Sequence, residues 1–154
     1  MRVVDNLEHI NDEQNIDREE EYDVLIPQGT YEVKCCKHEA KTYFAGAKKL
    51  KIVWEVVSPV RYAGVKVESY CNYEYARFPK KSKYWAWWVT ANHNIKPSRP
   101  YKARMSPKIF EGKVFEAYVE VIKPTFKNGL IKPEVHHYSL VTDLISISVG
   151  GKNE

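Results

Sequence analysis

Apolar and polar residues alternate along most of the chain after residue 23, a period of two that is typical of half-buried β-strands. The clearest run, residues 48–57, places four apolar side chains on one side: Leu50, Ile52, Trp54 and Val56. Similar patterns predict strands over residues 29–41, 65–74, 114–123 and 135–147. We therefore expect a mainly β protein with five strands and with Trp54 in its core.

One segment follows a helical period instead. Ser82 has the side chain of a helix N-cap, and it precedes residues 83–92. The spacing i, i+3, i+4 then puts three apolar residues on one stripe: Trp85, Trp88 and Val89. We expect this stripe to pack onto the strands, leaving two other aromatic residues toward one flank, Tyr84 and Trp87.

Three predicted strands precede the helix and two follow it. This order is the layout of an OB-fold, a five-stranded Greek-key barrel with one helix between strands 3 and 4. A helix at this location would be unusual in a β-sandwich, and an RRM-like sheet would need one after its first strand. We expect residues 24–149 to form one OB-fold domain, with residues 150–154 as a frayed C-terminus.

The charges are distributed unevenly. Residues 1–23 hold nine acids and two bases, a net charge of −7, whereas the remainder has a net charge of +11. Because apolar residues in the first segment follow no sustained period, we expect an acidic, disordered tail. Two roles are open for this tail: it solubilises the protein, or it lies over the basic surface and competes with nucleic acid.

The most basic stretch runs over residues 75–110, which contain nine lysines and arginines and not one acid. Eight aromatic residues are interleaved with these cations. Cations displace the counterions of a phosphodiester backbone, and aromatic rings stack on unpaired bases. The pattern therefore favours nucleic-acid binding, with a solvated basic surface over an aromatic core as the alternative.

Few residues point to other chemistry. Three cysteines, two of them adjacent, fit neither a disulfide framework nor a zinc site, which indicates a reducing compartment. No apolar run is long enough for a membrane span, and we expect a cytoplasmic protein without membrane partners. The five histidines are scattered along the chain. Cys36 and His38 are the one pair suited to Cys-His catalysis, because both lie on the same face of a predicted strand. We expect no enzyme activity, no metal and no cofactor.

Several short segments carry a family resemblance. They are PQGTYEV at residues 27–33, WEVV at 54–57, YAGVKV at 62–67, KPSR at 96–99 and MSP at 105–107. They resemble small proteins of bacteriophages and integrated mobile elements, a group similar to OB-fold single-stranded-DNA-binding proteins. The resemblance spans roughly residues 26–144, and it implies DNA binding in replication or recombination. Bacterial single-stranded-DNA-binding proteins recruit partners with an acidic, glycine-rich C-terminal tail. This chain departs from that pattern, because it lacks such a C-terminal tail and has its acidic segment at the N-terminus.

In an OB-fold the ligand crosses strands 2 and 3 between the loops that join strands 1 to 2 and strands 4 to 5. The expected floor consists of Lys49, Lys51, Lys66 and Tyr70. The expected loop contacts are Tyr43, Phe44, Lys48, Phe126 and Lys127. A basic flank would add Arg77, Lys80, Lys81, Lys83, Arg99, Lys102 and Arg104.

Single-stranded DNA is the expected partner. Binding to RNA, homo-oligomerisation and a partner protein of replication or recombination stay open. Two alternatives also remain: an inhibitor or adaptor module whose basic surface meets an acidic protein, and an accessory protein that binds duplex DNA.

Overall fold

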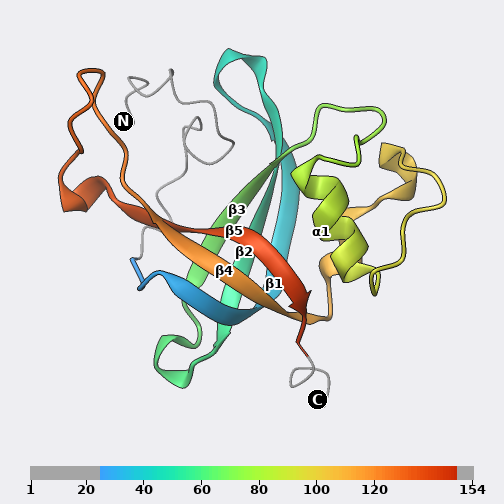
Figure 1. Cartoon of the computed structure of the whole chain (residues 1–154), viewed down its shortest axis with the longest axis horizontal. Coiled ribbons are helices and arrows are strands. Elements are labelled where there is room, and N and C mark those ends of the chain that lie inside the picture. The colour runs from blue at the N-terminus through green and yellow to red at the C-terminus, as the bar shows by residue number, and fades with distance from the viewer. Residues whose placement is uncertain (1–24, 149–154) are drawn as a thin grey trace.

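The computed structural model describes residues 25–148, so the expected acidic tail and the expected frayed C-terminus lie outside the described residues. The chain is mainly β, as predicted (Figure 1). The strands are β1 (Gly29–Thr42), β2 (Lys48–Ser58), β3 (Lys66–Asn72), β4 (Val114–Ile122) and β5 (Tyr138–Ile147), and α1 (Lys83–Ala91) lies between β3 and β4 in the chain. The predicted strand positions are thereby confirmed to within a few residues.

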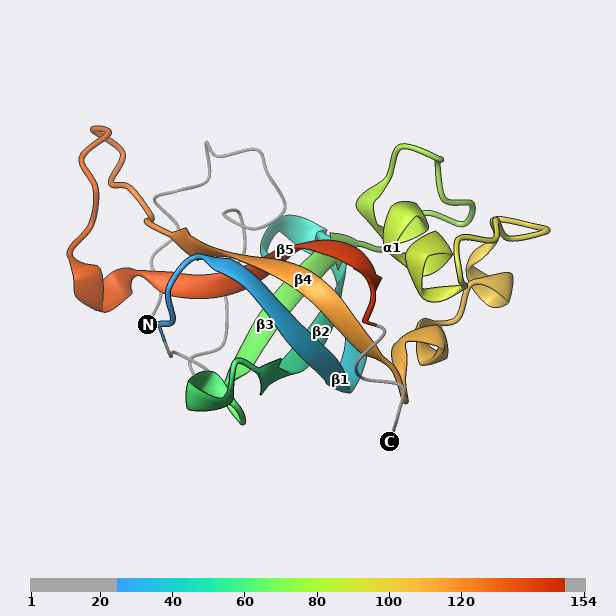
Figure 2. The same cartoon turned by 60° about the horizontal axis from the view of Figure 1, so that its bottom comes forward.

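The five strands close in a ring in the order β1-β2-β3-β5-β4 (Figure 2). All neighbours are antiparallel except β3 and β5, which pair in parallel at Glu68 and Leu140. The ring closes because β1 is long enough to pair with two strands. Its first residues pair with β4, and register shifts between Glu32 and Val33 and between Cys35 and Lys37 accompany its pairing with β2. Such irregularities bend a strand and increase its twist.

Trp54 lies at the centre of the core, as its place in the alternating pattern predicted. Its side chain is fully buried, and its indole Nε1 donates a 2.9 Å hydrogen bond to Ser69 Oγ. Three aromatic rings meet it edge to face at centroid distances of 5.7 to 6.2 Å: Trp87, Phe110 and Phe115. Pairs of this geometry stabilise a core by about 0.5–1.5 kcal/mol each beyond the burial of their area.

A second buried cluster lies apart from the core around Trp54. It consists of Tyr70, Ile122, Tyr138 and Leu140, with Tyr43 packed against it. Tyr70 alternates along β3 with Ser69 and Cys71, and Cys71 belongs to the main core. The strand is therefore buried on both faces, although its sequence alternates like that of a strand with one face in water.

The helix begins as predicted, because Ser82 Oγ accepts a 3.3 Å hydrogen bond from the backbone N–H of Trp85. Its predicted packing face is wrong in part: the buried residues are Tyr84, Trp87, Trp88 and Ala91. Two of the residues expected on that face, Trp85 and Val89, are only half-buried. Both the predicted and the observed set of residues have helical spacing, so spacing alone does not decide which set is buried. Tertiary contacts decide it: the Tyr84 hydroxyl donates a hydrogen bond to the carbonyl of Met105, and the Trp87 ring contacts Trp54.

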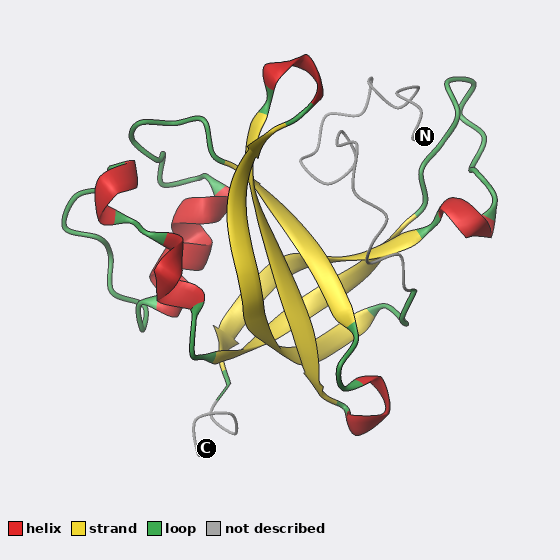
Figure 3. Ribbon diagram, turned by 180° about the vertical axis from the view of Figure 1, so that it is seen from behind, coloured by secondary structure: helices red, strands yellow, loops and turns green. Residues whose placement is uncertain are grey.

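Residues 75–110, which we call the basic lobe, fold beside the ring. The lobe contains α1 and two 3-10 helices, η4 (Lys102–Arg104) and η5 (Pro107–Phe110), and α1 packs against β3 and β5. In Figures 1 and 3 the lobe lies on one side of the ring, while the loop from β4 to β5 projects on the opposite side. Within residues 25–148, no helix has the length and apolar character that crossing a membrane requires.

Candidate functional site

The basic lobe carries a set of exposed cations. Seven of its nine lysines and arginines are exposed: Arg77, Lys80, Lys81, Lys96, Arg99, Arg104 and Lys108. In the part of the chain that the structure describes, none of these seven side chains forms an ion pair. Their charge is therefore available to an anionic ligand.

The two remaining cations of the lobe lie closer to its aromatic residues. Lys102 is half-buried, with its Nζ atom 4.5 Å from the ring centroid of Tyr73, and Lys83 Nζ lies 5.2 Å from that of Trp87. Lys102 also donates a 2.7 Å hydrogen bond to the carbonyl oxygen of Tyr73. Lys102 was predicted to belong to the basic flank that contacts a ligand. Its side chain instead contributes to the packing of the lobe.

Most aromatic side chains of the lobe belong to the core. Phe78, Tyr84, Trp87, Trp88 and Phe110 are buried. The sequence left two roles open for these aromatic residues, stacking on bases or forming a core beneath a basic surface. For these five residues the second role is correct. Tyr101 is different, because 42% of its surface is exposed.

The expected floor on β2 and β3 is not an open surface in this structure, which corrects that prediction. Lys51 is 1% exposed and Tyr70 is fully buried, and Lys49 is also buried. Lys51 Nζ lies 4.0 Å from a carboxylate oxygen of Glu68, whose other oxygen accepts a hydrogen bond from the Tyr70 hydroxyl. These polar side chains lie at the second cluster, which covers their face of the strands. The alternation of apolar and polar residues along β2 and β3 therefore did not predict which side chains face solvent. Lys66, the fourth floor residue, is half-buried.

The hairpin from β1 to β2 holds the next group. Tyr43 is half-buried and meets Tyr70 edge to face at 5.8 Å, so it packs against the second cluster instead of standing at a loop tip. Lys48 is exposed, as expected of a loop contact. Phe44 begins the 3-10 helix η2 (Phe44–Gly46), and its side chain lies outside the described part of the structure.

The loop from β4 to β5 exposes Phe126 and Lys127, as expected. Phe126 is 42% exposed, and Lys132 Nζ lies 5.4 Å from its ring centroid. The loop is ordered by a bridge between Thr125 and Ile131 and by a 2.8 Å hydrogen bond from the N–H of Phe126 to the carbonyl of Leu130. It also exposes three apolar residues that the sequence patterns did not single out: Leu130, Ile131 and Val135.

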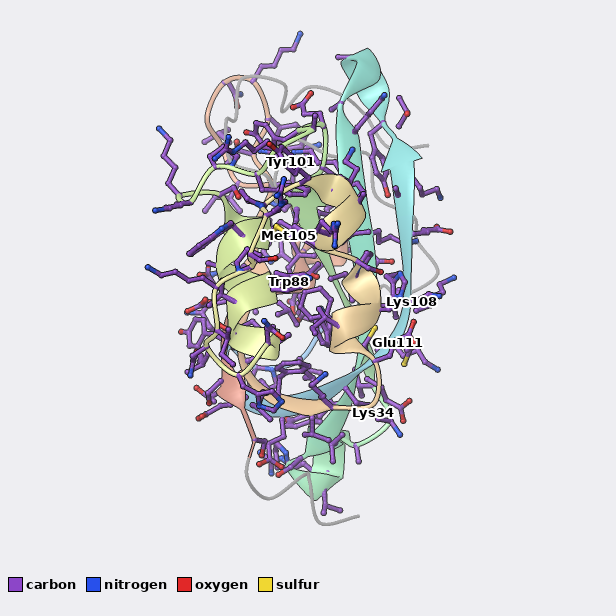
Figure 4. The ribbon with its side chains drawn as sticks, turned by 90° about the vertical axis from the view of Figure 1, so that its right-hand side faces the viewer. Lys34, Trp88, Tyr101, Met105, Lys108 and Glu111 are labelled. Carbon is purple, nitrogen blue, oxygen red and sulfur yellow. The ribbon has the colours of Figure 1, made fainter. Side chains whose placement is uncertain are left out.

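The predicted site residues do not form one continuous surface. The lobe and the β4–β5 loop lie on opposite sides of the ring, with the β1–β2 hairpin between them (Figure 3). Figure 4 faces the lobe and shows Tyr101, Met105 and Trp88 along it, with Lys108 and Glu111 to one side. A ligand that contacts both the lobe and the loop must therefore cross the ring.

Tyr101 is exposed in the lobe but was not among the residues predicted to contact a ligand. Its signal was present in the sequence, because Tyr101 follows Pro100 in the basic loop after the helix.

Cys36 and His38 bond to different acidic residues in this structure. Cys36 Sγ donates to Glu55 Oε1 at 3.6 Å, and His38 Nε2 lies 2.8 Å from Glu111 Oε2. Burial and the hydrogen bond to Glu55 raise the pKa of the Cys36 thiol above its ordinary value. A catalytic thiol requires the opposite shift, because the thiolate is the nucleophile.

Two adjoining pockets lie near the turn from β2 to β3. One, of about 500 Å³, is lined in part by Pro27, Tyr31, Arg61 and Tyr62. The other, of about 420 Å³, is lined mainly by hydroxyl and carboxylate groups, including those of Glu32 and Glu116. Within residues 25–148, no three side chains of the metal-binding types are grouped to hold an ion.

No known protein family matches the sequence of this chain. No curated protein is significantly similar to it in sequence.

Proposed function

We propose that this protein binds single-stranded DNA during replication or recombination of a phage or mobile element, and that its ring of strands is an OB-fold. The strand order of the ring and the place of α1 after β3 support the OB-fold assignment. Proteins of this fold bind oligonucleotides through surfaces that the barrel and its loops provide.

The observation that carries the proposal is the set of seven exposed cations on an acid-free lobe. Unpaired cations concentrated on one side of a protein produce a positive potential that attracts polyanions. Each phosphate contact releases condensed counterions, which is favourable at low salt. The β4–β5 loop adds Phe126 and Lys127 as a second, smaller contact region on the other side of the ring.

The first test is fluorescence anisotropy with labelled single-stranded oligo-dT and with a duplex of equal length. We expect tighter binding to the single strand and a linear fall of log Kobs with log salt concentration. The slope for single strands is about −0.7 per phosphate contact. An affinity that stays constant between roughly 50 and 200 mM salt would contradict a mode led by the phosphate backbone.

Two triple variants with the same change in charge locate the interface. In the lobe, Lys80, Lys81 and Arg104 are each replaced by Gln; on the ring and its turn, Lys34, Lys37 and Arg61 are replaced in the same way. All six side chains are exposed. We expect the lobe variant to bind oligo-dT more weakly and to make the salt slope shallower by about two, since three contacts at about 0.7 each are lost.

The ring variant serves as the control for net charge, and we expect it to change the affinity much less. Equal losses in both variants would mean that net charge, and not the lobe, attracts the ligand. No binding to either nucleic acid would favour the alternative of an acidic protein partner, whereas equal binding to both would favour a duplex-binding accessory protein.

A further inference from the structure

Tyr101 is the one exposed aromatic residue of the basic lobe. Five others are buried in the lobe and two, Tyr75 and Trp85, are half-buried. An exposed ring in the most basic part of the chain offers an apolar, flat surface beside positive charge. That combination is the chemistry that binds an unstacked nucleotide.

The backbone around Tyr101 is held on both sides. Tyr101 and Arg77 form an antiparallel β-bridge, which is flanked by hydrogen bonds from the N–H of Phe78 to the carbonyl of Pro100, 2.8 Å, and from the N–H of Lys102 to the carbonyl of Ala76, 3.0 Å. The carbonyl of Tyr101 itself accepts a 2.8 Å hydrogen bond from the N–H of Arg104. A ring on such a fixed backbone loses little conformational freedom when a ligand stacks on it.

Arg77 brings a cation to this ring. Its guanidinium carbon lies 5.7 Å from the Tyr101 centroid, which is within the range of a cation–π interaction. Arg77 is exposed, and among residues 25–148 its guanidinium forms no hydrogen bond or ion pair. A planar guanidinium with free N–H groups can hold a phosphate through two parallel hydrogen bonds. Two further exposed arginines, Arg99 and Arg104, lie within three residues of Tyr101 in the chain.

We propose that Tyr101 and Arg77 form a nucleotide-binding point of the lobe, at which a base of single-stranded DNA stacks on the Tyr101 ring and Arg77 binds a neighbouring phosphate. This inference rests on the proposed function. It assigns the preference for single strands to one residue, because the bases of a duplex already stack on each other and offer no free face to Tyr101.

The test measures three ligands of equal length by fluorescence anisotropy: oligo-dT, an abasic oligonucleotide and a duplex. The abasic strand keeps the phosphates and removes the bases. We expect Tyr101→Ala to weaken oligo-dT binding about 5- to 150-fold, the range of base stacking on one aromatic residue. The same variant should change the affinities for the abasic strand and the duplex by less than about twofold, because those ligands do not stack on it.

Four further variants sharpen the result. Tyr101→Phe and Tyr101→Trp keep an aromatic face and should retain oligo-dT binding, whereas Tyr101→Leu keeps apolar volume without that face and should lose it. Arg77→Met should weaken oligo-dT and the abasic strand alike, because it removes a phosphate contact. Ile95→Ala removes an exposed apolar side chain of the same lobe and should leave all three affinities unchanged.

The outcomes separate this inference from the proposed function. Wild-type protein that does not bind oligo-dT would overturn the proposed function itself. Wild-type binding that is equally strong in Tyr101→Ala and Tyr101→Leu would overturn the stacking role of Tyr101 and leave the proposed function standing. An equal loss on oligo-dT and on the abasic strand would also overturn it, because the ring would then act only by positioning Arg77.

Discussion

The ammonium nitrogen of Lys102 lies 4.5 Å from the ring centroid of Tyr73 and donates a 2.7 Å hydrogen bond to the carbonyl oxygen of the same residue. Tyr73 follows β3 directly, whereas Lys102 begins η4. One side chain therefore joins the end of a ring strand to the distant part of the basic lobe. The sequence pattern predicted Lys102 as a ligand contact, but its geometry gives it a structural role.

We predict that Lys102→Met lowers the free energy of unfolding by about 1–3 kcal/mol, since it removes a hydrogen bond from a charged donor and a cation–π contact. Urea denaturation measures this change. Arg104→Met is the matched control, because Arg104 is exposed two residues away, and its effect on stability should stay within about 0.5 kcal/mol. Arg104→Met should instead weaken oligo-dT binding. If Lys102→Met instead weakens oligo-dT binding without lowering stability, Lys102 contacts the ligand and our structural assignment is wrong.

A second prediction concerns the hydrogen bond inside the core. Ser69→Ala leaves the buried indole N–H of Trp54 without its acceptor, and the desolvated donor costs about 1–3 kcal/mol. Ser69→Thr keeps the hydroxyl, so it reports the effect of an added methyl group in the same place. We expect a lower urea midpoint for Ser69→Ala with an unchanged denaturant slope. An unaltered midpoint would mean that Trp54 finds another acceptor.

The third prediction is a loss of stability at alkaline pH. Burial raises the pKa of the Cys35 thiol from its ordinary value of 9.0 to about 12, with smaller contributions from the nearby Cys36 and Glu111. Between these two pKa values the unfolded chain releases the proton while the folded protein retains it. The unfolded state is then favoured, so stability is complete below about pH 9 and falls as the pH rises beyond it.

Thermal unfolding at several pH values from about 7.5 to 10.5 measures this decline. Cys35→Ala should make the decline between about pH 9 and pH 10 shallower, and the Cys36 thiol, whose pKa is also raised by burial, accounts for what remains. From about pH 10 the tyrosines whose pKa values are raised by burial also contribute: Tyr31, Tyr73 and Tyr84. If the wild type and Cys35→Ala lose stability in parallel from pH 9, the Cys35 thiol is not the group responsible.

The fourth prediction concerns the acidic N-terminal segment. Residues 1–23 have a net charge of −7 and are tethered to a remainder of net charge +11. A tethered segment acts at a high effective concentration, in the millimolar range for a short flexible link, so we expect it to compete with DNA for the basic surface. Deleting residues 1–23 should therefore tighten oligo-dT binding, most strongly at low salt, where screening is least.

The control for this deletion is a full-length variant in which acids of residues 1–23 are replaced by their amides, which removes charge without shortening the chain. Both proteins should gain affinity if charge is the cause. Unchanged affinity at both low and high salt would mean that the segment only solubilises the protein or binds another protein. Loss of folding in the truncated protein would contradict our expectation that these residues are dispensable for the domain.

The last prediction uses the separation of the two contact regions. Because the lobe and the β4–β5 loop project from opposite sides of the ring, a short oligonucleotide can occupy one of them but not both. We expect Phe126→Ala to leave the affinity for the shortest lobe-bound oligo-dT unchanged and to weaken that for longer ones. A series from roughly 4 to 30 nucleotides, which spans the site sizes of OB-folds, measures this. A loss that is independent of length would place Phe126 in the primary site.

Local patterns in the sequence determined where the strands and the helix lie. The alternation of Leu50, Ile52, Trp54 and Val56 predicted β2 and the burial of Trp54, and the side chain of Ser82 predicted the start of α1. These features depend on residues close together in the chain, on side chains that alternate across a strand and on a cap that bonds within one turn. The sequence also contained the acid-free character of residues 75–110.

Tertiary structure decided which of these faces meet water. Lys51 and Tyr70 have the alternation of exposed residues, but they are buried beside a cluster that includes Tyr138 and Leu140, residues that are distant in the chain. The helix presents Tyr84 and Trp87 to the core because their partners, Met105 and Trp54, lie on other elements. Tyr101 stays exposed beside Arg77 because a bridge between remote backbone segments holds it there. Each outcome depends on contacts between distant residues, and a local period carries no information about them.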